Sequence, residues 1–271
     1  MSLPPASPTS TVVITGASSG IGTELARALA ELGHHVTLVA RGAERLEELA
    51  GELGAAGRES EVLPCDLAHP RERAQLIGRL EGSGRLVVGL CNNAGFGTSG
   101  RFAELPLERE LEEVSLNVGA VHHLTGALLG PMVGRGSGAV LNVASIAGFQ
   151  PMPGMATYAA SKAFVISFSE ALHTELRGSG VSCTVLCPGP TETEFSRTAG
   201  LADLEAAGRR VFASPADVAR AGVRAMVAGR RIAFPRALDA GAAVAGRFSP
   251  RSVSLRVIGS ATIGALRRAG R

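Results

Sequence analysis

Short apolar runs alternate with helical patterns along most of the chain. Seven of these runs, rich in Val, Leu, Ile and Ala, have the length of β-strands. They cover residues 11–15, 35–40, 61–64, 86–91, 138–143, 181–186 and 231–234. Because the runs are almost continuously apolar and do not alternate with polar residues, we expect strands that are buried on both faces, as in a parallel sheet.

Segments with helical periodicity separate these strands. The predicted helices cover residues 22–32, 43–56, 71–80, 107–117, 121–133, 158–177 and 215–228. The fold class is therefore α/β: a doubly wound parallel sheet of about seven strands with helices on both faces, in a single domain. In such sheets the ligand site lies at the carboxyl ends of the strands, and the unusual polar residues of this chain follow those ends.

Composition fits one large domain, which we place at residues 11–235. The chain has 271 residues, of which 45% are hydrophobic. Residues 1–10 are rich in Pro and Ser and are expected to form a disordered tail. They have neither the basic start nor the apolar core of a signal peptide. Because no apolar run reaches about 18 residues, no membrane-spanning helix is expected.

Positive charge is concentrated at the C-terminal end. Residues 236–271 carry seven Arg against Asp239, a net charge of +6, so the remainder of the chain sums to −3. The main body is therefore not expected to bind nucleic acid. Interleaved Arg and apolar residues predict a basic amphipathic extension over 236–271. This extension can pack on a neighbouring subunit, form a loose solvated end, or lie on an anionic membrane surface.

Cysteine spacing gives no sign of a metal site or a disulfide framework. Cys65, Cys91, Cys183 and Cys187 form no CxxC pair, and they lie in or beside strand-like runs. Buried reduced thiols are expected, which fits a cytoplasmic protein without a bound metal.

A glycine-rich turn follows the first predicted strand. Gly16, Gly20 and Gly22 lie between that strand and a helix, with Ser18, Ser19 and Ile21 among them. Glycines at this position allow a tight turn and a close approach of the backbone to a pyrophosphate, and the helix N-terminus supplies N–H donors. This context predicts a dinucleotide site.

The end of the second strand indicates which dinucleotide binds. An acidic residue there would contact the ribose hydroxyls of NAD, whereas a basic one would pair with the 2′-phosphate of NADP. This chain has no acid between His34 and Ala43, and Arg41 follows Gly22 by 19 residues. NADP(H) is favoured over NAD(H), although Arg41 can also merely follow the strand.

The chain contains one tyrosine and one lysine, and they lie four residues apart. All other basic residues that are not His are Arg, so Lys162 indicates a position where Arg would not serve. On a helix, Tyr158 and Lys162 share one face. An ammonium at ~4 Å would lower the phenol pKa by about 3 units, toward the range in which acid–base catalysis is efficient. The alternative is a surface helix that carries both residues by chance.

Four asparagines and one serine add to this pattern. Asn92 and Asn93 end the fourth strand, and Asn117 lies inside a predicted helix, where Asn is a poor helix former. Asn117 can bend that helix and hold a water, whereas Asn142 within a strand is expected to be structural. Ser145 ends the fifth strand and can donate a hydrogen bond to a substrate carbonyl.

Together these residues resemble the classical short-chain dehydrogenase/reductase family. The shared motifs are TGASSGIG at 15–22, NNAG at 92–95, Asn117, Ser145, and Tyr158 with Lys162 as YxxxK. The match spans residues 11–235 in the order typical of the family. It implies a Rossmann-type fold, hydride transfer between a nicotinamide and a carbonyl or alcohol, and a homodimer or homotetramer.

The resemblance also implies a role for each matched residue. Tyr158 would be the proton donor and acceptor, while Lys162 would bind the nicotinamide ribose and lower the pKa of the tyrosine. Ser145 would orient the carbonyl, and Asn117 would hold a water of the proton relay. The other cofactor-binding positions implied are Gly16, Ser18, Ser19, Gly20, Ile21, Gly22, Asp66, Leu67, Asn93, Ala94, Gly95, Pro188, Gly189 and Thr191.

The expected substrate pocket is mostly apolar. Its predicted walls are Phe96, Gly97, Phe149, Met152, Pro153, Met155 and Pro190, with a lid at about residues 192–212. A hydrophobic ketone or aldehyde is therefore the expected substrate, unless these Met and Phe side chains belong to the core. Two other functions stay open: an NADP-binding regulator or scaffold without turnover, and an NADP-linked epimerase or dehydratase. The intact Ser145, Tyr158 and Lys162 set argues against the first, and the short chain against the second.

Overall fold

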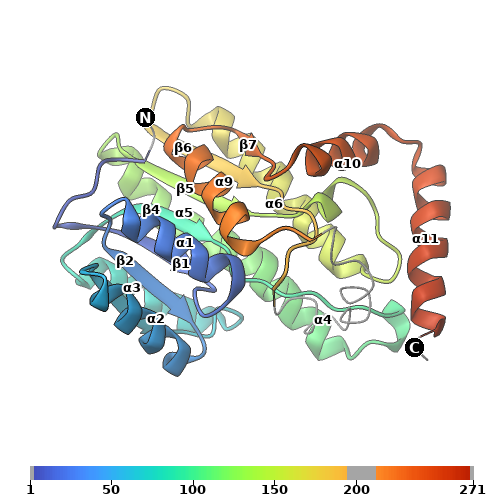
Figure 1. Ribbon diagram of the computed structural model, residues 1–271, viewed down its shortest axis with the longest axis horizontal. Helices are drawn as coiled ribbons and strands as arrows, with labels where there is room; N and C mark the ends of the chain where they lie inside the picture. The colour runs from blue at the N-terminus through green and yellow to red at the C-terminus, as the bar shows by residue number, and fades with distance from the viewer. Residues whose placement is uncertain (1–2, 194–211, 269–271) are drawn as a thin grey trace.

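Seven parallel strands form one sheet at the centre of the molecule (Figure 1). The computed structural model describes residues 3–193 and 212–268. The strand order is β3-β2-β1-β4-β5-β6-β7. The strands are β1 Ser10–Thr15, β2 Val36–Ala40, β3 Ser60–Pro64, β4 Leu86–Asn92, β5 Gly138–Val143, β6 Val181–Leu186 and β7 Ile232–Ala233. The predicted fold class and all seven predicted strands are confirmed.

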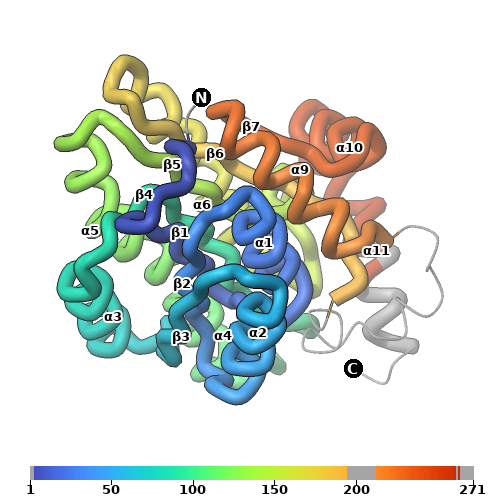
Figure 2. The backbone as a smooth tube through the Cα atoms, turned by 60° about the vertical axis from the view of Figure 1, so that its left-hand side comes forward, coloured from blue at the N-terminus to red at the C-terminus, as the bar shows by residue number. Residues whose placement is uncertain are grey.

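Helices cover both faces of this sheet (Figure 2). Apolar side chains of α1, α2 and α9 pack on one face, and those of α3, α5 and α6 pack on the other. The bounds are α1 Gly20–Glu31, α2 Ala43–Ala55, α3 Pro70–Gly82, α4 Leu107–Val114, α5 Val121–Gly134, α6 Ala156–Glu175, α9 Pro215–Val227, α10 Ala237–Phe248 and α11 Arg251–Arg268. Short 3₁₀ turns at Phe102–Glu104 and Ile146–Phe149 (η3) were not predicted.

The order of the strands places the site. β1 pairs with β2 on one side and with β4 on the other, so the direction of winding reverses between β1 and β4. Ligands bind outside the carboxyl ends of strands at such a switch point. The glycine loop after β1 and the Asn-rich segment at the end of β4 both lie there.

The start of the chain differs from its prediction as a disordered tail. Leu3 is only 4% exposed and belongs to a core cluster with Val12 and Val88. A side chain at Gly89 would meet the Leu3 side chain at 3.1 Å. Residue 10 already begins β1. One buried leucine supplies apolar contacts that the Pro- and Ser-rich composition of residues 1–10 conceals.

The C-terminal extension folds onto its own chain, an arrangement that is none of the three predicted from its amphipathic pattern. Its two helices lie at the opposite end of the molecule from α2 and α3 (Figure 1). Asp239 of α10 is buried and pairs with Arg236, with an Nη2–Oδ1 distance of 2.7 Å. In α11, the Thr262 hydroxyl donates to the Pro153 carbonyl at 2.7 Å. The described part of the extension is therefore not a loose end.

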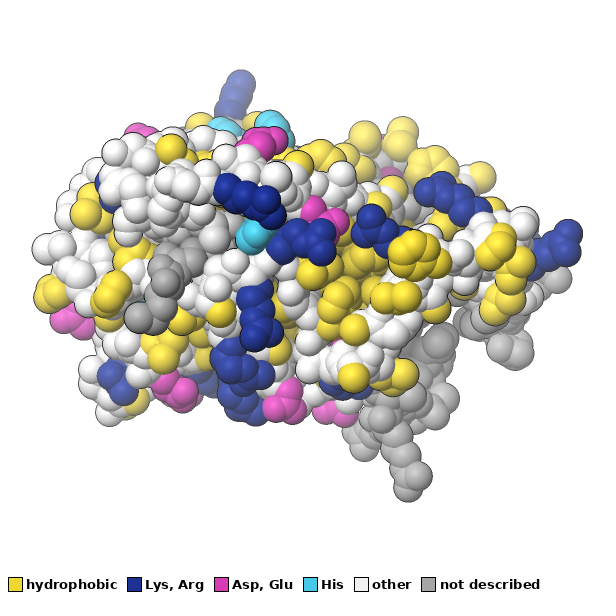
Figure 3. Space-filling view, turned by 90° about the horizontal axis from the view of Figure 1, so that it is seen from above, with side chains coloured by type: hydrophobic (Ala, Val, Ile, Leu, Met, Phe, Trp, Pro, Cys, Tyr) yellow, Lys and Arg dark blue, Asp and Glu magenta, His cyan; other side chains and the backbone are white. Residues whose placement is uncertain are grey.

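The outer surface of this extension remains apolar and basic. Figure 3 shows hydrophobic side chains beside Lys and Arg side chains at the end of the molecule where α10 and α11 lie. The exposed apolar residues there are Leu238, Val244, Phe248, Val253, Leu255 and Val257. None of the helices within residues 3–193 and 212–268 is both long and apolar enough to span a bilayer.

Candidate active site

Four predicted catalytic residues converge at the carboxyl edge of the sheet. Ser145 directly follows β5, whereas Tyr158 and Lys162 lie on one face of α6. The Ser145 hydroxyl hydrogen-bonds the Tyr158 phenol, and Lys162 Nζ lies 5.7 Å from the centroid of the Tyr158 ring. The Asn117 amide donates to Ser161 Oγ at 3.1 Å, within the same turn of α6. The structure therefore brings all four together.

Asn117 lies in a π-helical turn. Residues Ser115–Ala120 widen into this turn between α4 and α5, where the sequence predicted two helices separated by residues 118–120. The Asn117 side chain forms two hydrogen bonds with the backbone of Phe96, accepting from its N–H at 3.2 Å and donating to its C=O at 2.8 Å. π-turns of this kind are frequent at functional sites. The helix is thus irregular at Asn117, while the predicted bend and the bound water stay predictions.

The pKa of Tyr158 differs from its prediction. Burial raises it to about 12, outweighing the hydrogen bond from Ser145, which lowers it. Lys162 contributes no lowering of this pKa; its Nζ donates to the Val143 carbonyl at 3.0 Å and lies 5.7 Å from the centroid of the phenol ring. Burial also lowers the pKa of Lys162 to about 8, so its charged form is itself disfavoured. The sequence correctly predicted that both side chains lie on one face of α6. The predicted pKa of Tyr158 was too low because it left out the effect of burial, which the sequence does not show.

The glycine loop has the geometry its spacing predicts. Gly16 and Gly20 have φ values of +66° and +56°, a region that side chains disfavour. A Cβ at Gly22 would lie 2.0 Å from the Gly16 carbonyl oxygen, so α1 starts against the loop itself. The backbone at Ser19, Gly20 and Ile21 thus forms the half-buried N-terminus of α1, where an anionic group is favoured.

The NNAG segment holds this loop in place. Asn93 donates its amide to the carbonyls of Thr15 and Gly16 at 3.0 and 3.2 Å. The Thr15 hydroxyl in turn accepts the backbone N–H groups of Asn93 and Ala94 at 2.9 and 3.0 Å. The close packing leaves no room for a side chain at Gly95, whose Cβ would meet Asn117 Oδ1 at 2.8 Å. Asn93 therefore ties β1 to β4 beside the expected cofactor path.

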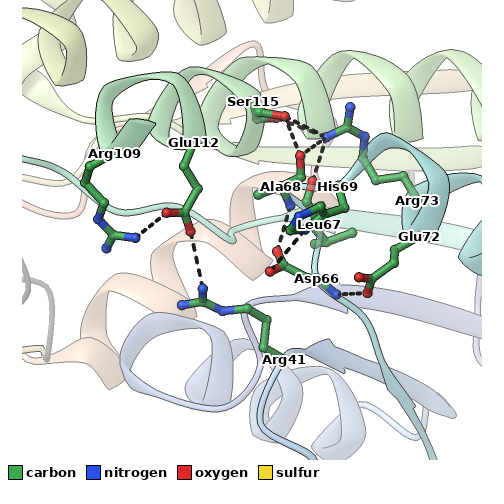
Figure 4. Close-up of polar contacts among 10 residues, drawn as sticks. All are labelled: Arg41, Asp66, Leu67, Ala68, His69, Glu72, Arg73, Arg109, Glu112 and Ser115. Carbon is green, nitrogen blue, oxygen red and sulfur yellow. Dashed lines mark hydrogen bonds and ion pairs between the residues drawn. The ribbon is translucent and has the colours of Figure 1, made fainter. Parts of the chain in front are cut away.

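A cavity of about 640 Å³ opens at the N-terminus of α1. Its lining includes Ser18, Ser19, Gly20 and Thr23 on one side and residues of α2 on the other. Arg41 follows β2 with its side chain 61% exposed, and its Nη1 pairs with Glu112 Oε1 at 3.3 Å (Figure 4). The same carboxylate binds Arg109 at 2.6 Å. Arg41 thus links the end of β2 to α4 through Glu112.

Asp66 and Leu67 lie in a hydrogen-bonded turn after β3 (Figure 4). The Asp66 carboxylate accepts the Ala68 N–H at 2.9 Å and approaches His69 Nδ1 at 3.3 Å. The buried Arg73 stabilises this turn by donating to the Leu67 carbonyl at 2.6 Å, and it also donates to the Ser115 carbonyl at 3.2 Å. Arg73 therefore joins the Asp66 turn to the π-turn that carries Asn117.

The segment after β6 lies against the C-terminal extension. Pro188 accepts the Ile146 N–H at 3.0 Å, and the Thr191 hydroxyl donates to the Gly189 carbonyl at 3.0 Å. A Cβ at Gly189 would come within 2.3 Å of Asp239 Oδ1. This segment and Ser145 thus border the same edge of the site.

Several expected substrate-pocket residues are close to the site, but they also have structural partners. The Phe96 ring is buried under the Arg109 guanidinium, 3.7 Å from its centroid, and Phe149 packs on Phe234 at 5.9 Å. The Met155 N–H bonds the Met152 carbonyl in the turn before α6. Pro153 touches α11 and Pro190 is exposed, while Gly97 is buried. Most of the expected lid, residues 194–211, lies outside the described residues.

Sequence reasoning missed two sets of buried charges near the site. Arg73 shares the inner face of α3 with Leu76 and Leu80. Glu110 and Glu113 lie on the inner face of α4, in line with Asn117 of the π-turn that follows. The sequence pattern could have revealed them, because residues 73, 76 and 80 and residues 110, 113 and 117 have the spacing i, i+3, i+7, which places each set on one face of a helix. Among the described residues no group of three or more His, Cys, Asp and Glu side chains is arranged to hold a metal.

Comparison with known proteins identifies the family. The family model for short chain dehydrogenases matches residues 10–204. A ketoacyl reductase, HetN, from a Nostoc species is 34% identical over 218 residues, covering 80% of this chain and 75% of HetN. A putative ketoacyl reductase from Streptomyces coelicolor is 39% identical over 187 residues, covering 68% of this chain and 71% of its own length. The chain belongs to the short-chain dehydrogenase family, as its motifs indicated.

Solved structures agree with this assignment. A short-chain dehydrogenase from Sphingobium yanoikuyae, in complex with NADPH, superposes with a TM-score of 0.79 and 34% identity. The match covers 86% of this chain and 90% of that protein. The chain is therefore an oxidoreductase of this family with its characteristic fold.

Proposed function

We propose that the protein interconverts a ketone or aldehyde and the corresponding alcohol, with NADP(H) as the hydride donor or acceptor and Tyr158 as the general acid and base. One observation carries this proposal: Ser145, Tyr158, Lys162 and Asn117 converge beside the glycine loop at the switch point of the sheet. A protein that only bound the dinucleotide would have no need of a phenol held by a serine hydroxyl.

The residues of the chain perform the proton chemistry. When bound, the nicotinamide supplies the hydride that reaches the carbonyl carbon. Tyr158 gives its phenolic proton to the carbonyl oxygen, and the Ser145 hydroxyl donates to the same oxygen as negative charge develops. The high pKa of Tyr158 keeps the proton on the phenol at neutral pH, which suits reduction. In the reverse direction the tyrosinate accepts the alcohol proton.

Two features support NADP(H) as the cofactor. The glycine loop and the N-terminus of α1 offer N–H donors to a pyrophosphate, and Arg41 presents an exposed guanidinium where NAD-binding members of such folds place an acid. The Sphingobium relative is in complex with NADPH. We assign the 2′-phosphate to Arg41, which would exchange Glu112 for the phosphate.

Replacing Arg41 by Ser should raise the KM for NADPH by about tenfold or more, because a charge-assisted pair is worth roughly 1.5–3 kcal/mol. The KM for NADH should change by less than threefold, since NADH carries no 2′-phosphate. Steady-state rates with each cofactor measure both values. Arg220→Ser, which removes an exposed arginine on α9, serves as the matched control. Equal losses with both cofactors would remove Arg41 from phosphate recognition.

The substrate class follows from the pocket and the relatives. The residues that border the site are largely apolar, and two relatives are described as ketoacyl reductases. We propose a hydrophobic carbonyl compound, and 3-ketoacyl thioesters are the first to test, followed by ketosteroids, quinones, long aldehydes and small sugars. NADPH consumption measured across this panel tests the proposal. Turnover of none of them with NADPH still bound would favour a cofactor-sensing protein.

The family resemblance implies a homodimer or homotetramer, and we propose a homo-oligomer. The exposed apolar side chains of α10 and α11 support an association surface on the extension. Light scattering after gel filtration gives the subunit number. The same measurement on the chain with Phe248→Ser and Val257→Ser shows whether these helices contribute.

A further inference from the structure

The inner face of α4 carries carboxyl groups where leucines would be ordinary. Glu110 is 3% exposed and Glu113 is 0% exposed, whereas Leu107, Leu111 and Val114 of the same helix point outward. Burying a charged group in place of an apolar one is costly unless it is paired or neutralised. Neither glutamate has a role in the chemistry described above.

Both carboxyls meet at one hydroxyl. Thr98 Oγ1 lies 2.5 Å from Glu110 Oε1 and 2.9 Å from Glu113 Oε2. The Thr98 N–H also donates to Glu113 Oε2 at 3.0 Å, and the Thr157 hydroxyl bonds the other oxygen of Glu110. A threonine hydroxyl carries one hydrogen, so it can donate to only one of the two carboxyls. The second contact needs a proton on a carboxyl group.

Burial identifies the carboxyl that holds this proton. Oε1 of Glu113 is buried and has no hydrogen-bond partner among the described residues, so the full charge of a carboxylate would be poorly solvated there. Burial also raises the pKa of Glu113 to about 7. When two carboxyls share one hydroxyl, the neutral form is best placed on the more deeply buried member, which is Glu113.

The catalytic pair lies within the field of Glu113. Its titratable neighbours are Glu110 on its own helix and Tyr158 and Lys162 on α6. A negative charge on Glu113 raises the pKa of both Tyr158 and Lys162, since it opposes the tyrosinate and favours the ammonium. Thr157, which bonds Glu110, directly precedes Tyr158 in the chain.

We propose that Glu110 and Glu113 hold one proton between them in the resting enzyme, and that Glu113 is a positioning residue whose ionisation at higher pH keeps the proton on Tyr158. The shared proton follows from the contacts of Glu110 and Glu113 with Thr98, and the bond from Thr157 to Glu110 joins this pair to α6 beside Tyr158. The consequence of the ionisation of Glu113, a wider pH range for carbonyl reduction, rests on the proposed function. The effect on the reverse reaction has the opposite sign, because alcohol oxidation needs the tyrosinate.

The single tyrosine and the absence of Trp make a direct test possible without a substrate. Tyrosinate absorption in the near ultraviolet reports Tyr158 alone, and stopped-flow pH jumps read it before the chain can unfold. Glu113→Gln keeps the size and the hydrogen bonds to Thr98 but cannot ionise. We expect the midpoint of Tyr158 ionisation to fall by about one pH unit in this variant. Glu108→Gln, on the exposed side of the first turn of α4, is the matched control and should leave the midpoint unchanged.

A second measurement uses the wild-type protein and therefore tests the proposal even if Glu113→Gln fails to fold. Infrared spectra of the wild-type protein should show the carbonyl band of a buried carboxylic acid that persists at pH 6, above the ordinary range of Glu, and fades as the pH rises through about 7. Absence of this band, or an unchanged Tyr158 midpoint in folded Glu113→Gln, would overturn the proposal. Neither result depends on whether the enzyme reduces a carbonyl.

Discussion

Replacement of Tyr158 by Phe is expected to lower kcat by about 10²- to 10⁴-fold, the usual contribution of a positioned general acid. The Tyr158 side chain is half-buried, hydrogen-bonded to Ser145 and close to Lys162, so its phenol is well placed to donate the proton. Phenylalanine keeps the ring and its packing, and only the hydroxyl is lost. The KM for NADPH should therefore stay within about threefold, and the rate of NADPH consumption with a turned-over carbonyl measures the effect.

Thr174→Val provides the matched control for this change. It also removes a hydroxyl from α6, but on an exposed part of the helix near its end. Turnover of this variant should equal that of the wild type. If Tyr158→Phe keeps more than a tenth of the wild-type kcat, the proton comes from another donor and the proposed role of Tyr158 is wrong.

Replacement of Gly22 by Ala should destabilise the protein and weaken dinucleotide binding together. A Cβ there would lie 2.0 Å from the Gly16 carbonyl oxygen and 2.6 Å from Asn93 Nδ2, so α1 must move away from the loop. Forcing atoms into a packed site costs roughly 1–3 kcal/mol, which corresponds to about 5- to 150-fold in an equilibrium constant. Thermal unfolding and NADPH fluorescence titration measure the two effects.

Gly51→Ala separates this clash from the general effect of alanine in a helix. Gly51 lies in α2, and a Cβ there would meet nothing within 4 Å. Alanine should stabilise the helix at this position by roughly 0.5–1 kcal/mol, and NADPH binding should not change. Both substitutions replace Gly by Ala in a helix. A lower melting temperature for Gly22→Ala and a higher one for Gly51→Ala would establish that the close approach of Gly22 to the loop, and not helix propensity, causes the loss of stability.

Local sequence patterns were sufficient to predict the sheet, the glycine loop and the candidate catalytic residues that the structure brings together. The strands of a parallel sheet are apolar along their whole length, so each was visible without its neighbours. Tyr158 and Lys162 are both unique in the chain and lie one helical turn apart, which predicted a shared face. Asn117 was conspicuous because Asn is a poor helix former, and the structure places it in the π-turn at Ser115–Ala120.

Predictions that depended on distant contacts were less successful. Leu3 is buried because its side chain packs against Gly89 of β4, which has no side chain of its own there. Residues 1–10 alone give no sign of this contact. The extension was predicted from its charge as an amphipathic segment, yet Asp239 is buried beside Gly189 and Thr262 reaches Pro153. Such contacts join residues far apart in the sequence.

The sequence by itself determined the class of fold, the position of the glycine loop and the placement of Tyr158 and Lys162 on one face of a helix, since periodicity and residue type act over a few neighbouring positions. The tertiary structure alone decided the electrostatics of the site. Burial raises the pKa of Tyr158 and lowers that of Lys162, and the shared hydroxyl of Thr98 forces a proton onto Glu110 or Glu113. Loss of solvent and the meeting of α4, α6 and the loop after β4 are properties of the assembled chain, because the charges involved interact through space and not along the sequence.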